Sequence, residues 1–205
     1  VFTTYYADDK LDQPFSSQDA QCQLPRRVVN RWSLKGGTSR SENVQTSYDT
    51  HGNLTEQTQA SGVKESYEYF PVAGIVGECP ADPTGFVRTL RKKTVTPAPG
   101  HSAGAPELRT CNQYALMPPL KGTATDASSH WLVLTDETLY EVNGAQEQPL
   151  QHSAYQTFNT PDDALRHGRR QQQAITLNGL TTRTDYSYQT LISTFAGETV
   201  LQTVE

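Results

Sequence analysis

Residues 44–70 constrain the fold more than any other stretch, because they have the pattern of three short strands joined by turns. Side-chain types follow a two-residue period in 44–49, 53–59 and 62–70, as in strands whose successive side chains point to opposite faces. Asp49 followed by Gly52 is the pair expected of a type I turn, since Asp caps the turn and Gly accepts a positive φ. The shared faces hold Val44, Thr46 and Tyr48 in the first strand, and Val63, Tyr67 and Tyr69 in the third. We predict a sheet-building unit with no chemistry of its own.

The composition favours a sheet over a compact globule. Apolar residues, Tyr included, make up 35% of the 205 residues, which is below the usual share for a globular domain. A partly disordered chain would have a similar share, but the many Thr, Val and Tyr residues favour strands. We therefore predict one all-β region over 1–205, made of serial antiparallel β-hairpins. The chain begins at Val1 rather than Met, which suggests a fragment.

Strands and turns are predicted along the rest of the chain from alternation and from Gly, Pro and Asn. Strands are expected at 1–6, 26–32, 86–96, 108–116, 131–135, 138–142 and 149–158, with two more between 191 and 204 around Gly197. Turns are expected at Gly36-Gly37, Asp136-Glu137 and Asn143-Gly144, and loops at 71–85 and 97–107. Thr160-Pro161-Asp162-Asp163 has the residue types of a helix start, and we expect at most one helical turn before Gly168.

A degenerate second copy of the opening pattern is predicted at 171–190. Gly179 followed by Tyr186 and Tyr188 echoes Gly62 followed by Tyr67 and Tyr69, with two more residues in the gap. We expect a single strand over 180–188 after the Asn178-Gly179 turn. The Tyr-Asp half of the pattern is missing from this copy.

Residues 48–55, Tyr-Asp-Thr-His-Gly-Asn-Leu-Thr, resemble the Tyr-Asp-x-x-Gly-Asn-Leu-Thr repeat of the RHS/YD-repeat family, over about one repeat. The matching residues are Tyr48, Asp49, Gly52, Asn53, Leu54, Gly62, Tyr67 and Tyr69. The resemblance implies hairpins that form a curved or spiralling sheet and close into a hollow shell, which in bacterial RHS toxins and toxin-complex B and C components encloses a toxic polypeptide. It also implies a secreted, non-enzymatic structural segment whose partners are the remainder of the same polypeptide and its toxin cargo.

The sequence around Asp82 allows two interpretations. Asp82-Pro83-Thr84-Gly85-Phe86 resembles the self-cleavage motif that ends the RHS core, in which an aspartate helps to cut the chain. Strand-like sequence continues for more than a hundred residues beyond it, and the Arg- and Tyr-rich segment expected before the motif is absent. We favour a structural Asp-Pro turn, and a hydrolase that uses Asp82 is a weaker alternative.

Other kinds of site have little support in the sequence. The net charge of −5, without a basic stripe, disfavours nucleic acid as a partner, and no apolar run reaches the roughly 20 residues that span a bilayer. Three distant cysteines favour free thiols, with a Cys79–Cys111 bridge as the alternative. No cofactor motif, metal-ligand spacing or catalytic constellation is present, and the five histidines are scattered.

The tyrosine pairs leave one binding hypothesis open. Tyr rings at period 2, as in Tyr67/Tyr69 and Tyr186/Tyr188, could stack on sugars and make this a carbohydrate- or cell-surface-binding module. Alternatively they pack between hairpins, where a cross-strand pair contributes about 0.2–1 kcal/mol. Exposed rings clustered in a groove would favour sugar binding, and rings buried between strands would favour packing. We favour packing.

Overall fold

The computed structural model describes residues 1–9, 11–33, 35–100, 104–122, 129–192 and 199–204. Its strands are β1 (Phe2–Tyr5), β2 (Pro25–Ser33), β3 (Ser39–Tyr48), β4 (Leu54–Thr58), β5 (Lys64–Tyr69), β6 (Leu90–Thr96), β7 (Glu107–Met117), β8 (Trp131–Asn143), β9 (Gln146–Thr157), β10 (Arg170–Leu177), β11 (Leu180–Asp185), β12 (Ser187–Ile192) and β13 (Thr199–Val204). Three short 3-10 helices, η1 (Tyr6–Asp9), η2 (Phe15–Ser17) and η3 (Ala20–Gln23), lie between β1 and β2.

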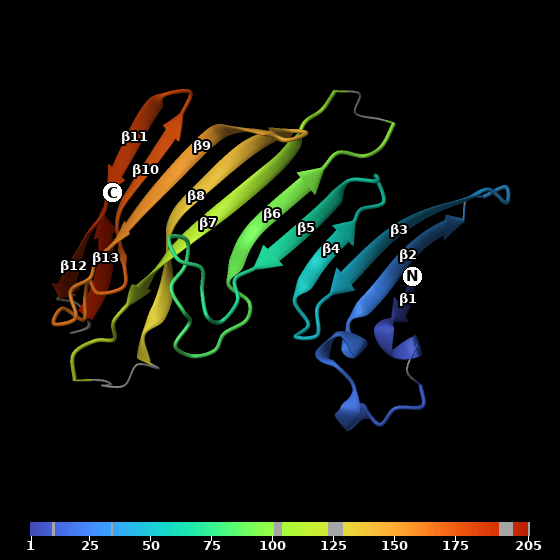
Figure 1. The fold of residues 1–205 in the computed structure, drawn as a ribbon, viewed down its shortest axis with the longest axis horizontal. Coiled ribbons are helices and arrows are strands. Elements are labelled where there is room, and N and C mark those ends of the chain that lie inside the picture. Colours follow the sequence, from blue (N-terminus) through green and yellow to red (C-terminus); the bar gives the residue numbers. More distant parts are fainter. Residues whose placement is uncertain (10, 34, 101–103, 123–128, 193–198, 205) are drawn as a thin grey trace. The chain divides into compact units, whose positions relative to one another are not determined.

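The strands are hydrogen-bonded in chain order. One sheet runs from β1 to β11, each strand beside the next in sequence, and β12 pairs with β13 in a second sheet (Figure 1). Pairing is antiparallel from β1 through β5, from β9 through β11, and between β12 and β13. The prediction of an all-β fold built from serial antiparallel hairpins is confirmed.

Contacts divide the chain into two compact units. The first contains residues 1–69, 92–109 and 141–146, and the second contains residues 70–91, 110–140 and 147–205.

In the first unit, β3, β4 and β5 form the hairpins predicted for residues 44–70. Burial alternates along 44–48, so Val44, Thr46 and Tyr48 lie on the less exposed side of β3 as predicted. A bulge at Ser47/Tyr48 places Tyr48 opposite Leu54, because Thr55 is an extra residue on β4. The register then continues from β4 to β5, with Glu56 opposite Ser66.

In the second unit, β10 and β11 meet in the predicted two-residue turn. Leu177 pairs with Leu180, and both turn residues have positive φ, 51° at Asn178 and 76° at Gly179. These signs are those of a type I′ hairpin. The prediction of one strand over 180–188 is wrong: β11 ends at Asp185, and the N–H of Tyr186 bonds to the carbonyl of Gln171 before β12 begins.

The predicted turn at Asp136-Glu137 is also wrong. Residues 131–143 form the single strand β8, and the chain reverses at the predicted Asn143-Gly144 turn. No Gly, Asn or Pro lies at 135–138 to supply a turn conformation, so two adjacent acids are insufficient to break the strand. The Asp136 carboxylate instead lies 3.0 Å from Nε2 of His152 on β9.

Two further boundaries differ from expectation. The strand predicted over 86–96 begins only at Leu90, because the Asp82 turn and an irregular segment precede it. Residues 161–167 lie in turns, and the N–H of His167 bonds to the carbonyl of Asp163 at 2.9 Å, which agrees with the expectation of at most one helical turn. Residues 97–100 and 104–106 of the loop predicted over 97–107 lie outside the strands, Glu107 is instead the first residue of β7, and 101–103 lie outside the described residues. The strands predicted at β2, β7 and β9 are confirmed. Gly197 lies outside the described residues.

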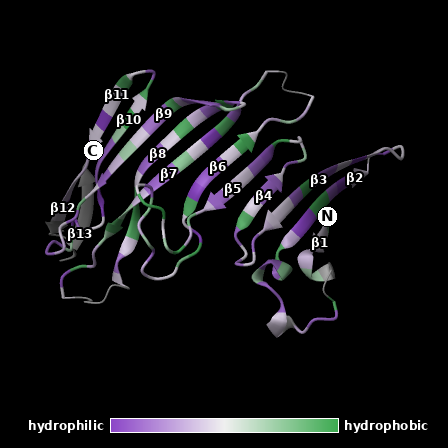
Figure 2. Ribbon diagram, in the orientation of Figure 1, coloured by the Kyte–Doolittle hydropathy of each residue, from purple (hydrophilic) through white to green (hydrophobic). Residues whose placement is uncertain are grey.

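The described part of the chain has few fully buried side chains. The buried apolar residues there are Cys22, Phe70, Cys79, Met117 and Val142. Figure 2 shows hydrophobic and hydrophilic residues alternating along the strands. Cys22, Cys79 and Cys111 form no disulfide, in agreement with the favoured prediction, so the alternative Cys79–Cys111 bridge is not formed. Among the described residues, no helix has the length and hydropathy needed to cross a membrane.

Gly52→Val should destabilise the repeat hairpin. Gly52 has a φ of +78°, and a Cβ there would lie 3.3 Å from Cβ of Ala20. A non-Gly residue held in this region costs on the order of 1–3 kcal/mol, and a β-branched residue with a close neighbour is at the upper end. Urea unfolding measures the loss. Gly144→Val is the matched control, since its φ is +63° and its Cβ would enter open space. An unchanged midpoint for Gly52→Val would contradict the turn assignment.

Candidate functional site

The repeat turn is built around the Asp49 carboxylate. Oδ1 accepts the backbone N–H groups of His51 (2.9 Å) and Asn53 (2.8 Å), while Oδ2 accepts the side-chain amide of Asn53 (2.8 Å). The N–H of Gly52 closes the turn on the Asp49 carbonyl at 3.0 Å. Burial raises the pKa of Asp49, but the hydrogen bonds from Asn53 and His51 outweigh it and hold the pKa below its usual value. The motif residues Asp49, Gly52 and Asn53 thus form one hydrogen-bonded turn, and Gly62 closes a similar one by donating to the carbonyl of Gln59 at 2.9 Å.

Asp82 lies in a turn with the same geometry as the Asp49 turn. Its Oδ1 accepts the backbone N–H of Thr84 (2.8 Å) and the Thr84 hydroxyl (2.7 Å). The N–H of Gly85, at a φ of 72°, bonds to the Asp82 carbonyl at 3.3 Å. Burial raises the pKa of Asp82, but hydrogen bonds from Thr84, Phe86 and Gly85 outweigh it and lower the pKa. This geometry supports the structural turn that the sequence favoured.

The first tyrosine pair is bonded within the sheet. Tyr69 on β5 donates its hydroxyl to the carbonyl of Leu54, the first residue of β4, at 2.9 Å. Tyr67 donates to Oε2 of Glu65 at 2.7 Å, and Nζ of Lys93 lies 5.6 Å from the centre of the Tyr67 ring. Burial and the bond to Glu65 raise the pKa of Tyr67 to about 12. Both rings are half-buried, and both hydroxyls have partners inside the protein.

The second tyrosine pair repeats one of these contacts, the hydroxyl–carbonyl bond. Tyr188 on β12 donates to the carbonyl of Arg170, the first residue of β10, at 2.9 Å. Tyr186 donates to Oε1 of Gln173 at 3.3 Å, in the place of the Tyr67–Glu65 bond. Phe158 packs edge-on against Tyr188, with ring centres 6.1 Å apart. The predicted echo at 171–190 therefore shares one contact with the first copy, the bond from a tyrosine hydroxyl to the carbonyl of the first residue in an earlier strand, although Tyr188 lies in the second sheet.

Tyr114 makes a third contact of this kind, which the sequence interpretation missed. Its hydroxyl bonds to the carbonyl of Leu90, the first residue of β6, at 3.1 Å, and Phe70 packs edge-on against its ring at 5.9 Å. Tyr6 is similar, with its hydroxyl on the Thr46 carbonyl at 2.8 Å and its ring edge-on to Tyr48. Neither lies in a Gly-x-x-x-x-Tyr-x-Tyr pattern, so spacing alone could not identify them.

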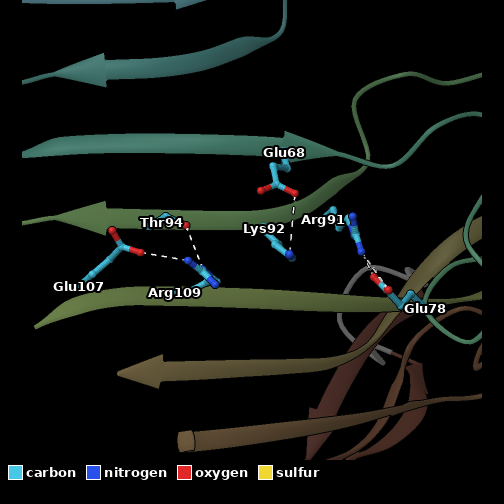
Figure 3. Close-up of polar contacts among 7 residues, drawn as sticks. All are labelled: Glu68, Glu78, Arg91, Lys92, Thr94, Glu107 and Arg109. Atoms are coloured by element: carbon cyan, nitrogen blue, oxygen red, sulfur yellow. Dashed lines mark hydrogen bonds and ion pairs between the residues drawn. The ribbon is translucent and has the colours of Figure 1, made fainter. Parts of the chain in front are cut away.

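Ion pairs connect β5 with β6 in the first unit. Lys92 lies 3.9 Å from Oε2 of Glu68, and Lys93 lies 2.9 Å from Oε1 of Glu65. Figure 3 shows the Glu68–Lys92 pair between neighbouring strands. Glu65 and Glu68 are three residues apart on β5, so their side chains point to opposite faces, and the two lysines pair with them on opposite faces as well. The two carboxylates therefore do not form a catalytic pair.

A second cluster lies between β6 and β7 in the same unit. Arg109 bonds to Oε1 of Glu107 at 3.0 Å and to the Thr94 hydroxyl at 3.4 Å (Figure 3). The other carboxylate oxygen of Glu107 accepts the Thr96 hydroxyl at 2.9 Å. These partly exposed contacts align neighbouring strands, and each exposed pair contributes only about 0–1 kcal/mol.

In the second unit, Arg91 makes a bidentate pair with Glu78. Its Nε and one terminal nitrogen lie 2.9 and 3.0 Å from the two carboxylate oxygens (Figure 3). The same guanidinium lies 5.9 Å from the centre of the Phe70 ring, which is only 3% exposed. The pair fixes the irregular segment before β6 to the start of that strand.

The described histidines do not form a common site. His167 accepts the N–H of Thr160 at Nδ1 (3.1 Å), and its Nε2 donates to the Pro118 carbonyl (2.7 Å), so its two bonds require the neutral ring. His152 pairs with Asp136, and His101 lies outside the described residues. Within the described residues, no group of three His, Cys, Asp or Glu side chains could hold a metal ion.

No family model matches the chain, and a search of curated proteins finds no match.

Removing the hydroxyl of Tyr69, Tyr114 or Tyr188 should destabilise the protein. Each Tyr→Phe change keeps the ring but deletes one hydroxyl–carbonyl bond, which contributes about 0.5–1.5 kcal/mol. Urea unfolding of the three single variants checks this. Tyr140→Phe is the control, since the Tyr140 hydroxyl bonds to none of the described residues. Equal midpoints for all four variants and the parent would show that these bonds contribute nothing.

Asp49→Asn should lower the free energy of unfolding at neutral pH. In the variant this free energy should also fall less than in the parent as the pH is lowered. Because the folded-state pKa of Asp49 is depressed, its contribution is present above the unfolded value, about 3.9, and is lost as pH falls through the folded value. Asn keeps an oxygen for the two backbone N–H groups but cannot ionise. We expect the difference from the parent to shrink between pH 5 and pH 2.5 in urea unfolding. Asp12→Asn, at an exposed position, is the control. A gap that stays constant over this range would contradict the assignment.

Proposed function

We propose that this chain is a structural segment of an RHS/YD-type β-repeat wall, which helps to enclose a toxic polypeptide and catalyses no reaction. The enclosing protein would be secreted or delivered extracellularly by a bacterium. Its partners would be the rest of the same polypeptide and the enclosed cargo.

The observation that carries the proposal is the repeated hydroxyl–carbonyl bond. Tyr69, Tyr114 and Tyr188 each bond to the first residue of an earlier strand, Leu54, Leu90 and Arg170. A sheet whose strands follow chain order, with one contact repeated between hairpins, can be lengthened by adding hairpins. Growth by repetition is what a wall requires.

The small number of buried side chains supports the same proposal. In the described part of the chain, Cys22, Phe70, Cys79, Met117 and Val142 are the only buried apolar residues. Such a set is small for a globular domain of this length, which normally buries one continuous core. Stability here comes from neighbouring hairpins, as in repeat proteins, so both sheet faces are left for contacts with other parts of a larger shell.

The alternative of sugar binding by the tyrosine stripes has less support. The rings of Tyr67, Tyr69, Tyr186 and Tyr188 are half-buried, and their hydroxyls bond to groups inside the protein. A stacking surface for sugars needs exposed ring faces. Packing between strands explains these four rings better.

Protease protection tests the proposal. It requires these residues to be continuous with further repeats and with a cargo segment, so the experiment uses that longer polypeptide. We expect the cargo segment within it to resist trypsin at concentrations that digest the same segment expressed separately. Equal digestion of the two would overturn the proposal.

A pair of glycine variants tests whether this chain contributes to the protection. Gly52→Val, which strains the repeat turn, should increase cleavage of the cargo segment, whereas Gly144→Ala at an open turn should change it less. The cleavage sites are read by mass spectrometry. Protection that is insensitive to both changes would assign enclosure to other parts of the polypeptide.

A further inference from the structure

Two neighbouring arginines on β2, Arg26 and Arg27, line one hollow in the first unit. The hollow has a volume of about 520 Å³, and its lining also includes Thr4, Tyr6, Gln45 and Glu56. This volume lies in the range of about 300–1,000 Å³ that is typical of small-ligand sites. The tyrosine bonds on which the proposed wall rests involve neither arginine.

A β-bulge explains why two adjacent side chains reach the same hollow. In a regular strand, neighbouring side chains point to opposite faces of the sheet. Between β1 and β2, however, Thr4 pairs with Arg27 and Tyr5 pairs with Pro25, so Arg26 is an extra residue on β2. A bulge bends its strand and re-aims a side chain, and here both guanidinium-bearing side chains border one volume.

Arg27 is oriented by a neighbour on β3. Its Nε donates to Oδ1 of Asn43 at 2.8 Å, which fixes the plane of the guanidinium. No described residue bonds to the two terminal nitrogens of Arg27, so their N–H groups remain for a ligand.

Arg26 is oriented by an aromatic ring. Its guanidinium carbon lies 5.6 Å from the centre of the Tyr6 ring, within the range of a cation–π contact. The Tyr6 hydroxyl donates to the carbonyl of Thr46 at 2.8 Å, which holds this ring against β3. Both arginines are therefore oriented before any ligand arrives, and an oriented side chain loses less conformational entropy on binding.

The lining of the hollow has more positive than negative charge. Its charged residues are Arg26, Arg27 and Glu56, and the Glu56 carboxylate is already paired with Nζ of Lys64 on β5 at 2.5 Å. Two cations on adjacent residues that border one volume repel each other, and an anion bound there offsets this repulsion.

Neutral hydrogen-bond donors extend the hollow across four strands. Thr4, Arg27, Gln45 and Thr58 are successive cross-strand partners from β1 to β4, and all four line the hollow. Because cross-strand partners share a face of the sheet, the two hydroxyls and the amide lie on the same side as the Arg27 guanidinium. Together these groups offer more donors than the two oxygens of a carboxylate can accept in bidentate pairing.

We propose that this hollow binds a phosphate group, through the guanidiniums of Arg26 and Arg27 and the neutral donors beside them. A phosphate group carries a charge of about −1.5 to −2 at pH 7 and three strong acceptor oxygens, which matches two cations and several donors. The planar fork of arginine pairs with phosphate oxygens in bidentate geometry. The site is independent of the proposed enclosure, because it uses none of the tyrosine bonds between strands.

Isothermal titration calorimetry at constant ionic strength tests this proposal. The probes are inorganic phosphate, AMP, adenosine, which is AMP without its phosphate, and acetate, an anion with a single charge. We expect inorganic phosphate or AMP to bind saturably, and adenosine and acetate to give no saturable heat. Tighter binding of AMP would identify a phosphate ester as the ligand, and tighter binding of inorganic phosphate would identify the free ion. Saturable binding by neither of these two, or equal binding of acetate or adenosine, would overturn the proposal.

Variants locate the binding in the hollow. Arg26→Gln and Arg27→Gln should each weaken phosphate binding by about tenfold or more, because each removes one charge-assisted donor group. Arg27→Lys should weaken it less, since Lys keeps the charge but loses the fork. Arg31→Gln is the matched control, because Arg31 is also exposed on β2 but lies outside the lining.

Thermal melting confirms that each variant is folded. Equal weakening by Arg31→Gln and Arg27→Gln would show that phosphate binding follows the net charge alone, which would reject the hollow as a site. Phosphate binding that is unaffected by both Arg26→Gln and Arg27→Gln would place the phosphate elsewhere and reject it as well.

Discussion

The structure depends on a hydrogen bond from a tyrosine hydroxyl to the carbonyl of the first residue in an earlier strand. Isolated hairpins are marginally stable in water, and the described part of the chain buries too few side chains to compensate through a core. The bonds from Tyr69, Tyr114 and Tyr188 fix the end of one strand to a later one, and the ring covers apolar surface between them. An edge-on aromatic ring supports Tyr114 and Tyr188. Loss of such contacts would leave neighbouring strands connected by backbone bonds and by partly exposed polar side-chain contacts, which contribute little each.

Two Asp-x-x-Gly turns fix the chain locally, in addition to the tyrosine bonds between strands. At Asp49 and again at Asp82, a carboxylate accepts backbone N–H groups, and a glycine three residues later adopts a positive φ. The first turn connects two strands of the repeat, and the second orients Phe86 before β6 begins. The same Asp-x-x-Gly turn thus occurs both between two strands and before an irregular segment. This is possible because the geometry of the turn depends on four consecutive residues and is independent of the segment that follows.

A wall needs repeated contacts between strands, and the tyrosine bonds meet that need with hydroxyls that are no longer available to a ligand. The groove that Tyr114 lines with Phe86 and Trp131 differs from the tyrosine pairs, because the rings of Phe86 and Trp131 are exposed.

The sequence by itself determined the hairpin at 44–70, the Asn178-Gly179 turn and the all-β class, because alternation and turn chemistry act over a few residues. It also identified Tyr186 and Tyr188 as an echo of Tyr67 and Tyr69, but it did not identify the groups to which these hydroxyls bond. Only the tertiary structure decided that β8 runs unbroken through Asp136-Glu137, that Tyr114 repeats the contact of Tyr69, and that Asp82, Phe86 and Trp131 line one groove. These features depend on residues that are distant in sequence, and a local pattern holds no information on which distant strand a side chain will meet.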